Sequence, residues 1–467
     1  MNEFAPLFEK LRANRWNIAR TTALKRVSKL KKLKAALLAH RGELQKAIFD
    51  DFRKNPGEVD LTEVYPAIAE INHAIRHLAT WMKPQPVTTP LVLFGTHSAI
   101  QYEPKGVVLI LSPWNYPFQL LMAPLIAAIA AGNSVVLKPS AKTPHTAHFM
   151  KKFIADLFPE DEIVLLEGDH QVADRLLELP FDHIFFTGSP EIGKKVMTMA
   201  ARHLASVTLE LGGKSPVIVD DTADIKKAAE RVVWGKFINA GQTCVAPDYL
   251  LIDEKRLTRF VAEAKKVIAH RYGDSEGMRR GGADFCRLVS EGHLERLKNI
   301  LEESIRKGAK IEFGGEIDPK ERYLSPTLLT GVTNESPIMK EEIFGPILPI
   351  LTYRHLDEAI QIIQKREKPL ALYLFSKAEK NIDQILNSTS AGGTCINSLI
   401  IHLANPDLPF GGVGQSGMGN YHGFFGFRTF SHERAVLRQG AIDLLRLFYP
   451  PYTPWVRRLI RWTIRFF

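Results

Sequence analysis

Residues 106–140 have the sequence GVVLILSPWNYPFQLLMAPLIAAIAAGNSVVLKPS, which decides the fold class of this chain. Residues 106–111 and 134–137 are short runs of Val, Leu and Ile, as in strands that are buried on both faces. Between them, residues 117–131 have the length of a helix. Two further apolar runs each precede a helical segment, at residues 163–166 and 183–186. This strand–helix alternation predicts a doubly wound parallel sheet.

A second alternating series starts at residues 217–219 and continues past residue 390. It contains helical segments near 223–240 and 256–270, and strand-like runs at 249–252 and 349–353. A chain of 467 residues is too long for one hydrophobic core, so the two series predict two α/β domains.

The segments before residue 106 differ from this alternation. In residues 5–82, apolar positions recur every three or four residues, which predicts helices. Pro84, Pro86 and Pro90 precede a short apolar run at residues 91–94, and the stretch from Ser98 to Tyr102 alternates as a strand does. We therefore expect a connector that resembles a hairpin.

Composition excludes several classes of protein. The formal net charge is +10, and residues 1–34 carry ten Lys and Arg against two Glu, yet no nucleic-acid-binding motif is present. Three cysteines far apart in the sequence cannot form a disulfide framework, which indicates a reducing compartment. No paired metal motif, signal peptide or transmembrane stretch is recognisable. We therefore expect a cytoplasmic protein without a bound metal or nucleic acid.

Cys244 lies in residues 237–247, FINAGQTCVAP, which are rich in small and polar side chains and end at a proline. This composition indicates a loop that presents a side chain. Such a cysteine can be a thiolate nucleophile if a neighbour lowers its pKa or accepts its proton. The alternative is a buried structural thiol, which is our interpretation of Cys286 and Cys395.

Two polar residues could complete a reaction centre around this nucleophile. Asn115 follows the strand at 106–111, at the edge where open α/β sheets bind ligands, and its amide could donate to an oxyanion. Glu210 ends an apolar run before two glycines. Desolvation there would raise its pKa and make it a usable general base. A turn asparagine and an exposed turn glutamate are the structural alternatives.

Three further segments have features of a nucleotide site. Gly188 follows a strand and precedes a helix whose free N–H groups can bind phosphate, although the GSxxxG spacing departs from GxGxxG. Lys138 ends a strand, from which its amine can reach a ribose or phosphate. Glu342 and Phe344 flank a tight turn, where a carboxylate can bind ribose hydroxyls and a ring can wall a nicotinamide. Each segment also has an ordinary structural explanation.

Seven segments together resemble the aldehyde dehydrogenase superfamily over residues 5 to about 435. In chain order they are LSPWNYPF, VVLKPS, FTGSPEIGK, LELGGK, NAGQTCVAP, EEIFGP and LPFGGVGQSGMG. Their wording is most similar to the class 3 branch, which acts on fatty and aromatic aldehydes. The resemblance implies an α/β fold with two doubly wound parallel-sheet domains and a small bridging or oligomerisation β element.

The resemblance also implies residue roles. Cys244 would attack the aldehyde, and Asn115 would hold the oxyanion together with the backbone N–H of Cys244. Glu210 or Glu342 would activate the water that hydrolyses the thioester. NAD or NADP would accept hydride, and an aldehyde would be oxidised to a carboxylic acid. Cofactor contacts are expected at Lys138, Gly188, Ser189, Gly193, Glu342 and Phe344.

The same resemblance divides the chain into parts. Residues 1–82 and 106–210 are expected to bind NAD(P), and residues 211–417 to carry the catalytic chemistry. Residues 83–105 and 418–435 would form the bridging element of a homodimer. The scattered walls of the substrate tunnel are expected to include Tyr65, Tyr116 and His402.

One position departs from the family pattern. The family often has a glutamate three residues after the lysine of VVLKPS, where it binds the adenosine ribose. This chain has Ala141 there, followed by Lys142. Loss of the carboxylate removes repulsion of a 2′-phosphate and the lysine could attract it, so we expect NADP to be accepted alongside NAD.

The C-terminal residues 436–467 form a distinctive tail. Trp455, Leu459, Trp462 and Phe466 recur at helical spacing, and the arginines 457, 461 and 465 share another face. This pattern is typical of an interfacial amphipathic helix, which predicts peripheral membrane contact through residues 452–467. The alternative is a helix packed on the protein body or on a dimer partner.

Two other enzymatic functions are alternatives at this stage. A CoA-acylating semialdehyde dehydrogenase would use the same nucleophile, but a water-activating Glu210 would compete with CoA. A cysteine hydrolase or acyltransferase would need a histidine partner, and neither the Cys244 segment nor the Glu210 segment contains one.

Overall fold

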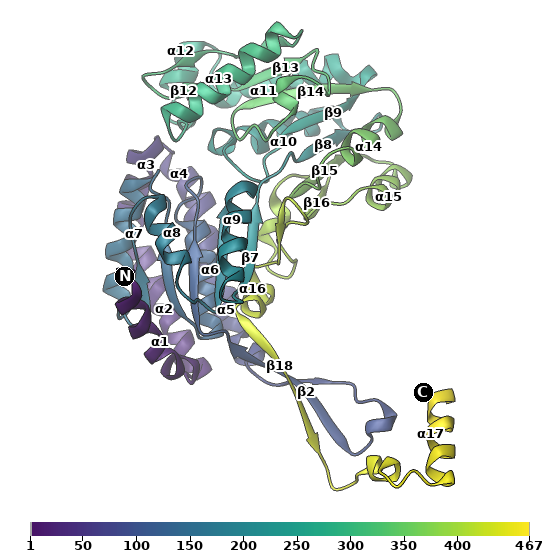
Figure 1. The fold of residues 1–467 in the computed structure, drawn as a ribbon. Helices are drawn as coiled ribbons and strands as arrows, with labels where there is room; N and C mark the ends of the chain where they lie inside the picture. Colours follow the sequence, from purple (N-terminus) through teal and green to yellow (C-terminus); the bar gives the residue numbers. More distant parts are fainter. Residues whose placement is uncertain (1, 467) are drawn as a thin grey trace.

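The computed structural model describes residues 2–466, and its first large unit is the predicted doubly wound sheet (Figure 1). The strand order is β17-β7-β6-β3-β4-β5, parallel except for β17 against β7. The bounds are β3 Val107–Leu111, β4 Ser134–Lys138, β5 Ile163–Leu165, β6 His183–Gly188, β7 Ser206–Leu211 and β17 Gly417–Met418.

Helices cover both faces of this sheet because successive side chains of a strand point to opposite faces. Val108 and Ile110 of β3 pack in the larger core, which includes α2, α5, α6 and α7. Val107 and Leu109 pack in a second core with α1, α8 and α9. The bounds are α1 Ala5–Ala19, α2 Ala23–Ala39, α3 Arg41–Phe52, α5 Tyr65–Trp81, α6 Gln119–Ala131, α7 Pro144–Leu157, α8 His170–Leu177, α9 Pro190–Ala201 and α16 Gly423–Thr429.

The second unit contains a seven-stranded sheet of order β10-β13-β14-β9-β8-β15-β16, parallel except for β10. Its strands are β8 Pro216–Val219, β9 Tyr249–Asp253, β10 Lys310–Phe313, β13 Thr327–Thr330, β14 Ile347–Tyr353, β15 Ala371–Phe375 and β16 Gly393–Ile396. A separate two-stranded sheet pairs β11 Ile317–Asp318 with β12 Tyr323–Leu324. The helices are α10 Ile225–Phe237, α11 Leu257–Tyr272, α12 Glu276–Gly281, α13 Glu291–Arg306, α14 Leu356–Gln364 and α15 Glu379–Ser388.

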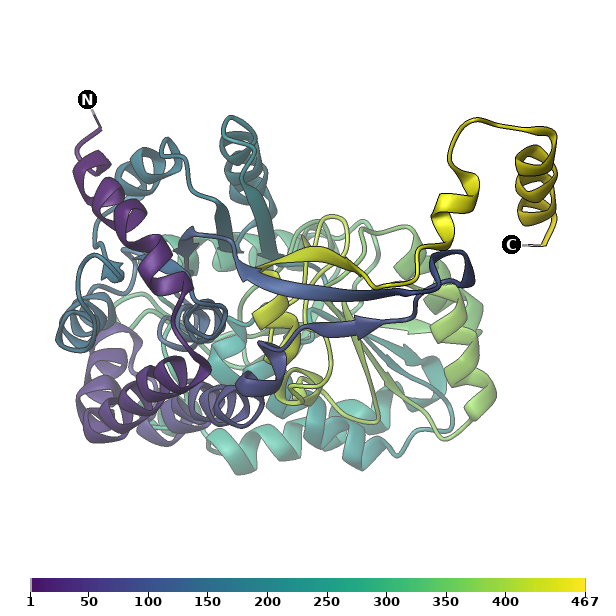
Figure 2. The same cartoon turned by 90° about the horizontal axis from the view of Figure 1, so that it is seen from below.

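A three-stranded antiparallel sheet and the C-terminal tail extend away from the two units (Figures 1 and 2). Strand β2 Thr96–Pro104 lies between β1 Gln85–Val87 and β18 Ser431–Gln439. The hairpin expected before residue 106 is therefore confirmed. Strand β18 runs four residues beyond residue 435, and a short helical turn Leu444–Phe448 then leads to α17 Pro454–Phe466.

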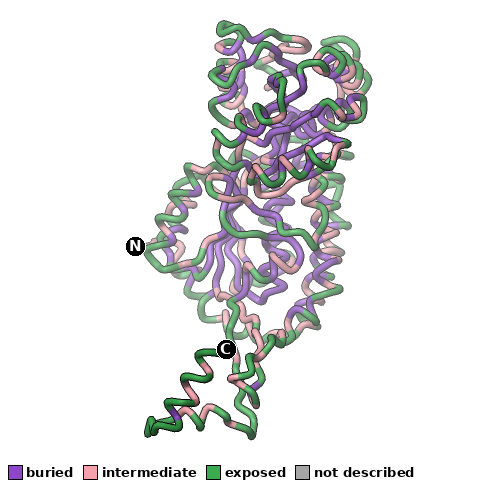
Figure 3. Tube along the Cα trace, turned by 90° about the vertical axis from the view of Figure 1, so that its right-hand side faces the viewer, coloured by how far each residue is buried: buried purple, intermediate pink, exposed green. Residues whose placement is uncertain are grey.

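The buried residues are distributed according to the division into two large units and a tail. Every residue of α6 is buried, as expected of a helix that is apolar on all sides. Figure 3 shows the buried residues concentrated in the two sheets and the helices behind them, whereas the tail is mostly exposed. No helix within residues 2–466 is both long and apolar enough to cross a bilayer.

A short segment joins the two large units near their contact. It contains α4 Pro56–Val59 and the π-helical turn Asp60–Val64. The backbone carbonyl oxygens of Asp51 and Phe52 accept hydrogen bonds from Arg322 and from the N–H of Arg287 in the second unit. The end of α3, just before this segment, is thus bonded to residues that lie more than 200 positions later in the sequence.

Candidate active site

The candidate site lies where the direction of the first sheet reverses. Strands β3, β4 and β5 follow one another outward, and the chain then returns to place β6 on the other side of β3. In open α/β sheets, ligands bind at such a reversal, outside the carboxyl ends of the strands. Asn115 follows β3 and Gly188 ends β6, so both lie at this edge.

The loop that carries Cys244 has an unusual backbone conformation. Asn239, Ala240 and Gly241 have φ values of 53°, 50° and 72°, in the left-handed region that non-glycine residues rarely adopt. A side chain at Gly241 would place a Cβ 2.3 Å from the carbonyl oxygen of Gly345. The sharp reversal ends α10 and leaves Cys244 partly exposed. The expected side-chain-presenting loop is confirmed.

Gln242 holds this loop in place. Its Nε2 donates to the carbonyl oxygens of Asn239 and Arg287 at 3.0 and 3.2 Å. Its Oε1 accepts from the N–H of Val289 at 2.9 Å. These buried bonds occupy both ends of the amide and fix the loop against the neighbouring segment.

Asn115 is buried and contacts the same loop. Its Nδ2 donates to the carbonyl oxygen of Gln242 at 3.0 Å, and its own carbonyl accepts from the Asn239 side chain at 2.9 Å. An amide nitrogen carries two hydrogens, so the second N–H of Asn115 can donate to a substrate oxygen. The expected placement beside Cys244 is therefore compatible with oxyanion binding.

Glu210 is 3% exposed, and neither of its carboxylate oxygens has a hydrogen-bond partner among the described residues. It lies on β7 opposite Thr187 of β6 and Gly417 of β17. Burial without partners raises the pKa of Glu210 well above its ordinary value. This is the direction expected from the sequence, and it favours a carboxyl that can take up a proton.

Glu342 is a second carboxyl with a raised pKa. Burial is the main cause and the nearby Asp248 adds to it, while the Gly213 backbone, Lys214 and Lys236 oppose it; the resulting pKa is about 8. Lys214 also pairs with Asp248 and donates to the carbonyl oxygens of Ile338 and Glu341. The turn before Phe344 is thus anchored by an ion pair.

The thiol of Cys244 is affected by both carboxylates. Burial raises its pKa to about 12, and the charges of Glu342 and Glu210 contribute in the same direction. The backbone N–H groups of Cys244 and Val245 act in the opposite direction. The free protein therefore holds a protonated thiol at neutral pH. A cationic ring beside the thiol would favour the thiolate.

The residues predicted to bind the dinucleotide fit such a ligand. Ser189 caps α9, and Gly193 lies so close to Leu211 that a Cβ would meet that side chain at 2.7 Å. The N-terminus of a helix such as α9 suits a phosphate. Lys138 is 5% exposed, and its Nζ donates to the carbonyl oxygens of Pro139 and Gly168 at 2.8 and 2.7 Å.

Phe344 has a φ of 53° and forms part of an aromatic group at the mouth of the site. Its ring centroid lies 5.3 Å from that of Trp114, nearly perpendicular to it, and 6.4 Å from that of His293. His293 also bonds the Phe344 carbonyl oxygen at 2.8 Å. These contacts give the Phe344 ring a defined position.

The three expected tunnel residues lie in different surroundings. Tyr65 is 62% exposed. Tyr116 is buried, and its hydroxyl lies 2.6 Å from the hydroxyl of Thr243, the residue before Cys244. His402 lies 3.1 Å from the sulfur of Cys395 through Nδ1. Cys395 therefore has a polar neighbour that its segment of sequence did not indicate.

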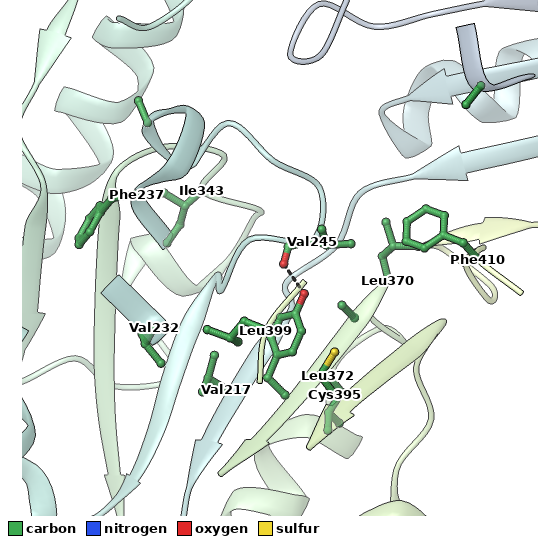
Figure 4. Packing of buried hydrophobic residues seen from close by; sticks show 14 of the residues in the cluster. Val217, Val232, Phe237, Val245, Ile343, Leu370, Leu372, Cys395, Leu399 and Phe410 are labelled. Atoms are coloured by element: carbon green, nitrogen blue, oxygen red, sulfur yellow. Dashed lines mark hydrogen bonds between the residues drawn. The ribbon is translucent and has the colours of Figure 1, made fainter. Parts of the chain in front are cut away.

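Several residues that support the site were not identified from the sequence. Tyr373 of β15 donates from its hydroxyl to the carbonyl oxygen of Val245 at 2.6 Å, the bond drawn at Val245 in Figure 4. Figure 4 also shows Leu399 and Cys395 packed in the core below Val245. A tyrosine in a buried strand has no local sequence signal for this role.

A buried ion pair supports the Asn115 side of the site. Lys54 and Glu63 are 0% exposed, and Lys54 Nζ lies 3.3 Å from Glu63 Oε1. Glu63 Oε2 accepts from the N–H groups of Phe118 and Gln119 at 3.1 and 2.8 Å, at the start of α6. Lys54 Nζ also lies 4.1 Å from the ring centroid of Tyr116.

Comparison with known proteins gives the family. The aldehyde dehydrogenase family model matches residues 8–436. This chain belongs to the aldehyde dehydrogenase family. It is 47% identical to the 4,4'-diaponeurosporen-aldehyde dehydrogenase of Staphylococcus aureus, over 91% of this chain and 92% of that protein. It is 43% identical to the mouse aldehyde dehydrogenase family 3 member B3, over 98% of this chain and 95% of the mouse protein.

A solved structure supports the same conclusion. The substrate-bound state of Staphylococcus aureus AldH superposes with a TM-score of 0.95 at 44% identity, covering 99% of this chain and all of that one. The aldehyde dehydrogenase assignment agrees with the α/β architecture of parallel sheets and with the resemblance to the class 3 branch. The protein is an oxidoreductase that acts on the aldehyde group, and the family uses NAD or NADP.

Among residues 2–466, no group of three or more metal-ligating side chains is placed to hold an ion.

Proposed function

We propose that Cys244 is the nucleophile and that Asn115 binds the oxyanion in an aldehyde oxidation that proceeds through a thioester. The observation that carries the proposal is the buried Asn115 amide, which donates one N–H to the Cys244 loop and has a second to offer. The thiolate adds to the carbonyl carbon, and the oxygen takes the negative charge beside that amide. A dinucleotide held by the residues around Gly188, Ser189 and Lys138 would supply the hydride acceptor. Loss of hydride re-forms the carbonyl and leaves an acyl group on sulfur.

We propose that Glu210 or Glu342 removes a proton from the water that attacks this thioester. Water adds to the acyl carbon, the carbon–sulfur bond breaks, and the carboxylic acid leaves with Cys244 again a thiolate. Both carboxyls have raised pKa values and both act on the Cys244 thiol. Glu210 has unpartnered oxygens, which suits a base that must accept a proton from a mobile water.

The test uses three variants. Cys244→Ala should abolish aldehyde-dependent formation of reduced cofactor, and Asn115→Ala should lower kcat by about 10²–10³-fold. Retained dehydrogenase activity in Cys244→Ala would contradict the assignment. A Glu210→Gln variant that still forms one equivalent of reduced cofactor, but turns over slowly, would place Glu210 in hydrolysis. CoA-dependent acyl transfer by wild type would favour the acylating alternative instead.

We propose that both NAD and NADP serve as acceptors. Ala141 supplies no carboxylate at the position where the family often has one, and Lys142 beside it is exposed, with Nζ 5.7 Å from the ring centroid of Trp114. Steady-state kinetics with each cofactor tests this. A kcat/KM for NADP more than about a hundredfold below that for NAD, a difference of about 2.7 kcal/mol, would contradict it.

We propose apolar substrates, either medium- or long-chain aliphatic aldehydes or aromatic ones. The similarity to a dehydrogenase named for 4,4'-diaponeurosporen-aldehyde, and to a family 3 member, supports this range. A panel of aliphatic and aromatic aldehydes should give kcat/KM values that rise with apolar surface. A preference for short polar aldehydes would contradict the proposal.

We propose that the tail contacts anionic membrane surfaces while the body stays in the cytoplasm. On α17, the side chains of Trp455, Ile464 and Phe466 are between half and three-quarters exposed, and Arg457 and Arg461 add cationic charge. Sedimentation with anionic vesicles at low salt tests this, with a variant ending at residue 449 as the control. Equal binding by both proteins, or by neither, would contradict it.

We propose a homodimer in which the three-stranded sheet bridges two copies. The outer strand β18 pairs only along the edge that faces β2, so its other edge is open to a further strand. In each copy, we propose that residues 1–82 and 106–210 bind the cofactor and that residues 211–417 carry the catalytic chemistry. Light scattering should give a mass near twice 52.5 kDa. A monomer at micromolar concentration would contradict the proposal.

A further inference from the structure

Lys105 lies at the end of the first sheet opposite the candidate active site. It precedes β3 by two residues, whereas Asn115 follows the other end of that strand. A hollow of about 630 Å³ lies beside it. Its lining residues are Glu103, Pro104, Lys105, Asp182, Ser206, Ser431, His432 and Glu433. None of these residues has a part in the reaction at Cys244.

The ammonium position of Lys105 has neutral neighbours. Its Nζ lies 2.9 Å from the hydroxyl of Ser206 and 3.2 Å from Nδ1 of His183. Within residues 2–466, no carboxylate oxygen lies within 4.0 Å of it, since it forms none of the ion pairs of the chain. A half-buried lysine without an anionic partner is destabilised in its charged form.

The three carboxylates around the hollow are already engaged. Asp182 Oδ2 accepts from the N–H of Val107 at 2.7 Å, close against Gly106. Glu103 pairs with Arg434 at 2.8 Å, and Glu433 pairs with Arg428. The remaining ionisable group, His432, is exposed. Glu103 and Glu433 are thus held by arginines, and Asp182 forms no ion pair with Lys105.

His183 also favours the neutral form of the Lys105 amine. His183 is 1% exposed, its Nε2 has no partner among the described residues, and its Nδ1 lies 2.9 Å from the Ser206 hydroxyl. An unpartnered lone pair is a smaller penalty than an unpartnered N–H, so the pattern favours the proton on Nδ1. An ammonium at Lys105 has no lone pair to accept from that N–H, whereas a neutral amine has one.

We propose that Lys105 is a covalent modification site for small aldehydes, separate from the reaction centre at Cys244. The lone pair of Nζ attacks the carbonyl carbon, forming a carbon–nitrogen bond, and a proton moves from nitrogen to the carbonyl oxygen. Loss of water, made from that hydroxyl and the second hydrogen on nitrogen, leaves an imine. No oxidant or reductant is required.

Access and the state of the amine distinguish Lys105 from other lysines. Burial lowers the pKa of Lys105 and of Lys236 to about 8, but Lys236 is 1% exposed and cannot meet a reagent. At pH 7 an amine with a pKa of 8 is about 9% neutral, against about 0.03% for an ordinary lysine. Less basic amines are weaker nucleophiles, so we expect a net advantage of about tenfold.

The experiment uses the full chain with acetaldehyde and cyanoborohydride, which traps the imine as an ethyl group. Peptide mass spectrometry then gives the labelling rate at each lysine between pH 6 and 9. Lys105 should label at least about tenfold faster than the exposed Lys46 and Lys266 at pH 7, with a rate that rises through pH 8. Equal rates at the three lysines would overturn the proposal.

Substitution at Ser206, which is exposed at the start of β7, provides matched variants. Ser206→Asp places a carboxylate against Nζ and should reduce labelling of Lys105 to the level of Lys46. Ser206→Ala should keep the fast labelling. Unchanged labelling in Ser206→Asp, with native circular dichroism, would overturn the assignment. Cys244→Ser should label Lys105 as wild type does, which separates this site from catalysis.

Discussion

Replacement of Glu63 by glutamine should destabilise this protein severely although it changes one atom. Glu63 and Lys54 are both 0% exposed and lie 3.3 Å apart. Glutamine keeps the shape but removes the one carboxylate that forms an ion pair with the buried Lys54 ammonium, which leaves only the more distant Glu58 to interact with it. It also replaces two charge-assisted bonds, from the N–H groups of Phe118 and Gln119, by weaker neutral ones.

The expected cost is about 3–5 kcal/mol in the free energy of unfolding, the range measured when one partner of a buried ion pair is removed. The double variant Lys54→Met with Glu63→Gln removes the unpaired cation as well. It should therefore be more stable than Glu63→Gln alone, by about 1 kcal/mol or more. The loop from Asn115 to α6 is held by Glu63, so kcat should fall in Glu63→Gln by about tenfold or more.

Urea unfolding, followed by fluorescence and circular dichroism together, measures these differences. The proteins compared are wild type, Glu63→Gln, Lys54→Met and the double variant. Glu160→Gln is the matched control. Its pair with Lys10 has a similar distance, 3.1 Å, but the two side chains are 62% and 60% exposed, so the cost should stay below about 1 kcal/mol. A cost for Glu63→Gln no larger than that of the control would refute the reasoning.

Three further predictions concern the site. Base catalysis requires a deprotonated carboxyl, and the pKa of Glu342 is about 8. If Glu342 is the base, the rate of thioester hydrolysis should therefore rise with pH through 8. Glu342→Gln should lose that inflection in the pH profile of deacylation, and Glu210→Gln should keep it. Tyr373→Phe removes the 2.6 Å bond to the carbonyl oxygen of Val245 and should cost about 1 kcal/mol in unfolding free energy, together with a lower kcat at unchanged KM for the cofactor. Ser189→Ala removes the cap of α9, and should cost about 1 kcal/mol of stability and raise the KM for NAD, measured by thermal unfolding and initial rates.

The reaction centre could be located from the sequence because its parts lie in loops next to strong strand signals. Asn115 and Gly188 each follow a run of buried β residues, and such runs define the edge of a parallel sheet before any contact is known. The raised pKa of Glu210 could also be anticipated, since an apolar strand end implies desolvation. The sequence predicts ribose binding or base catalysis for Glu342, and only its burial in the folded protein, together with the nearby Asp248, indicates how strongly its pKa is raised.

The buried contacts made by Lys54, Glu63 and His183 could not be predicted from local sequence patterns. Lys54 and Glu63 belong to a polar stretch of helices that is indistinguishable from a solvated one. Only the packing of the turn Asp60–Val64 under α6 buries them. Likewise, His183 appears in the sequence as the first residue of a strand. Its contact with Lys105, 78 residues earlier, depends on the pairing of β6 with β3 in the folded sheet.

The sequence alone determined the alternation of strands and helices and the family, and it predicted the nucleophile, because these depend on local periodicity and on short motifs. The tertiary structure decided which charges are buried, which carboxylates act on Cys244, and that the tail leaves the body. Burial and electrostatic coupling arise from contacts between residues distant in the chain. No local pattern records those contacts, and they set the pKa values on which the chemistry depends.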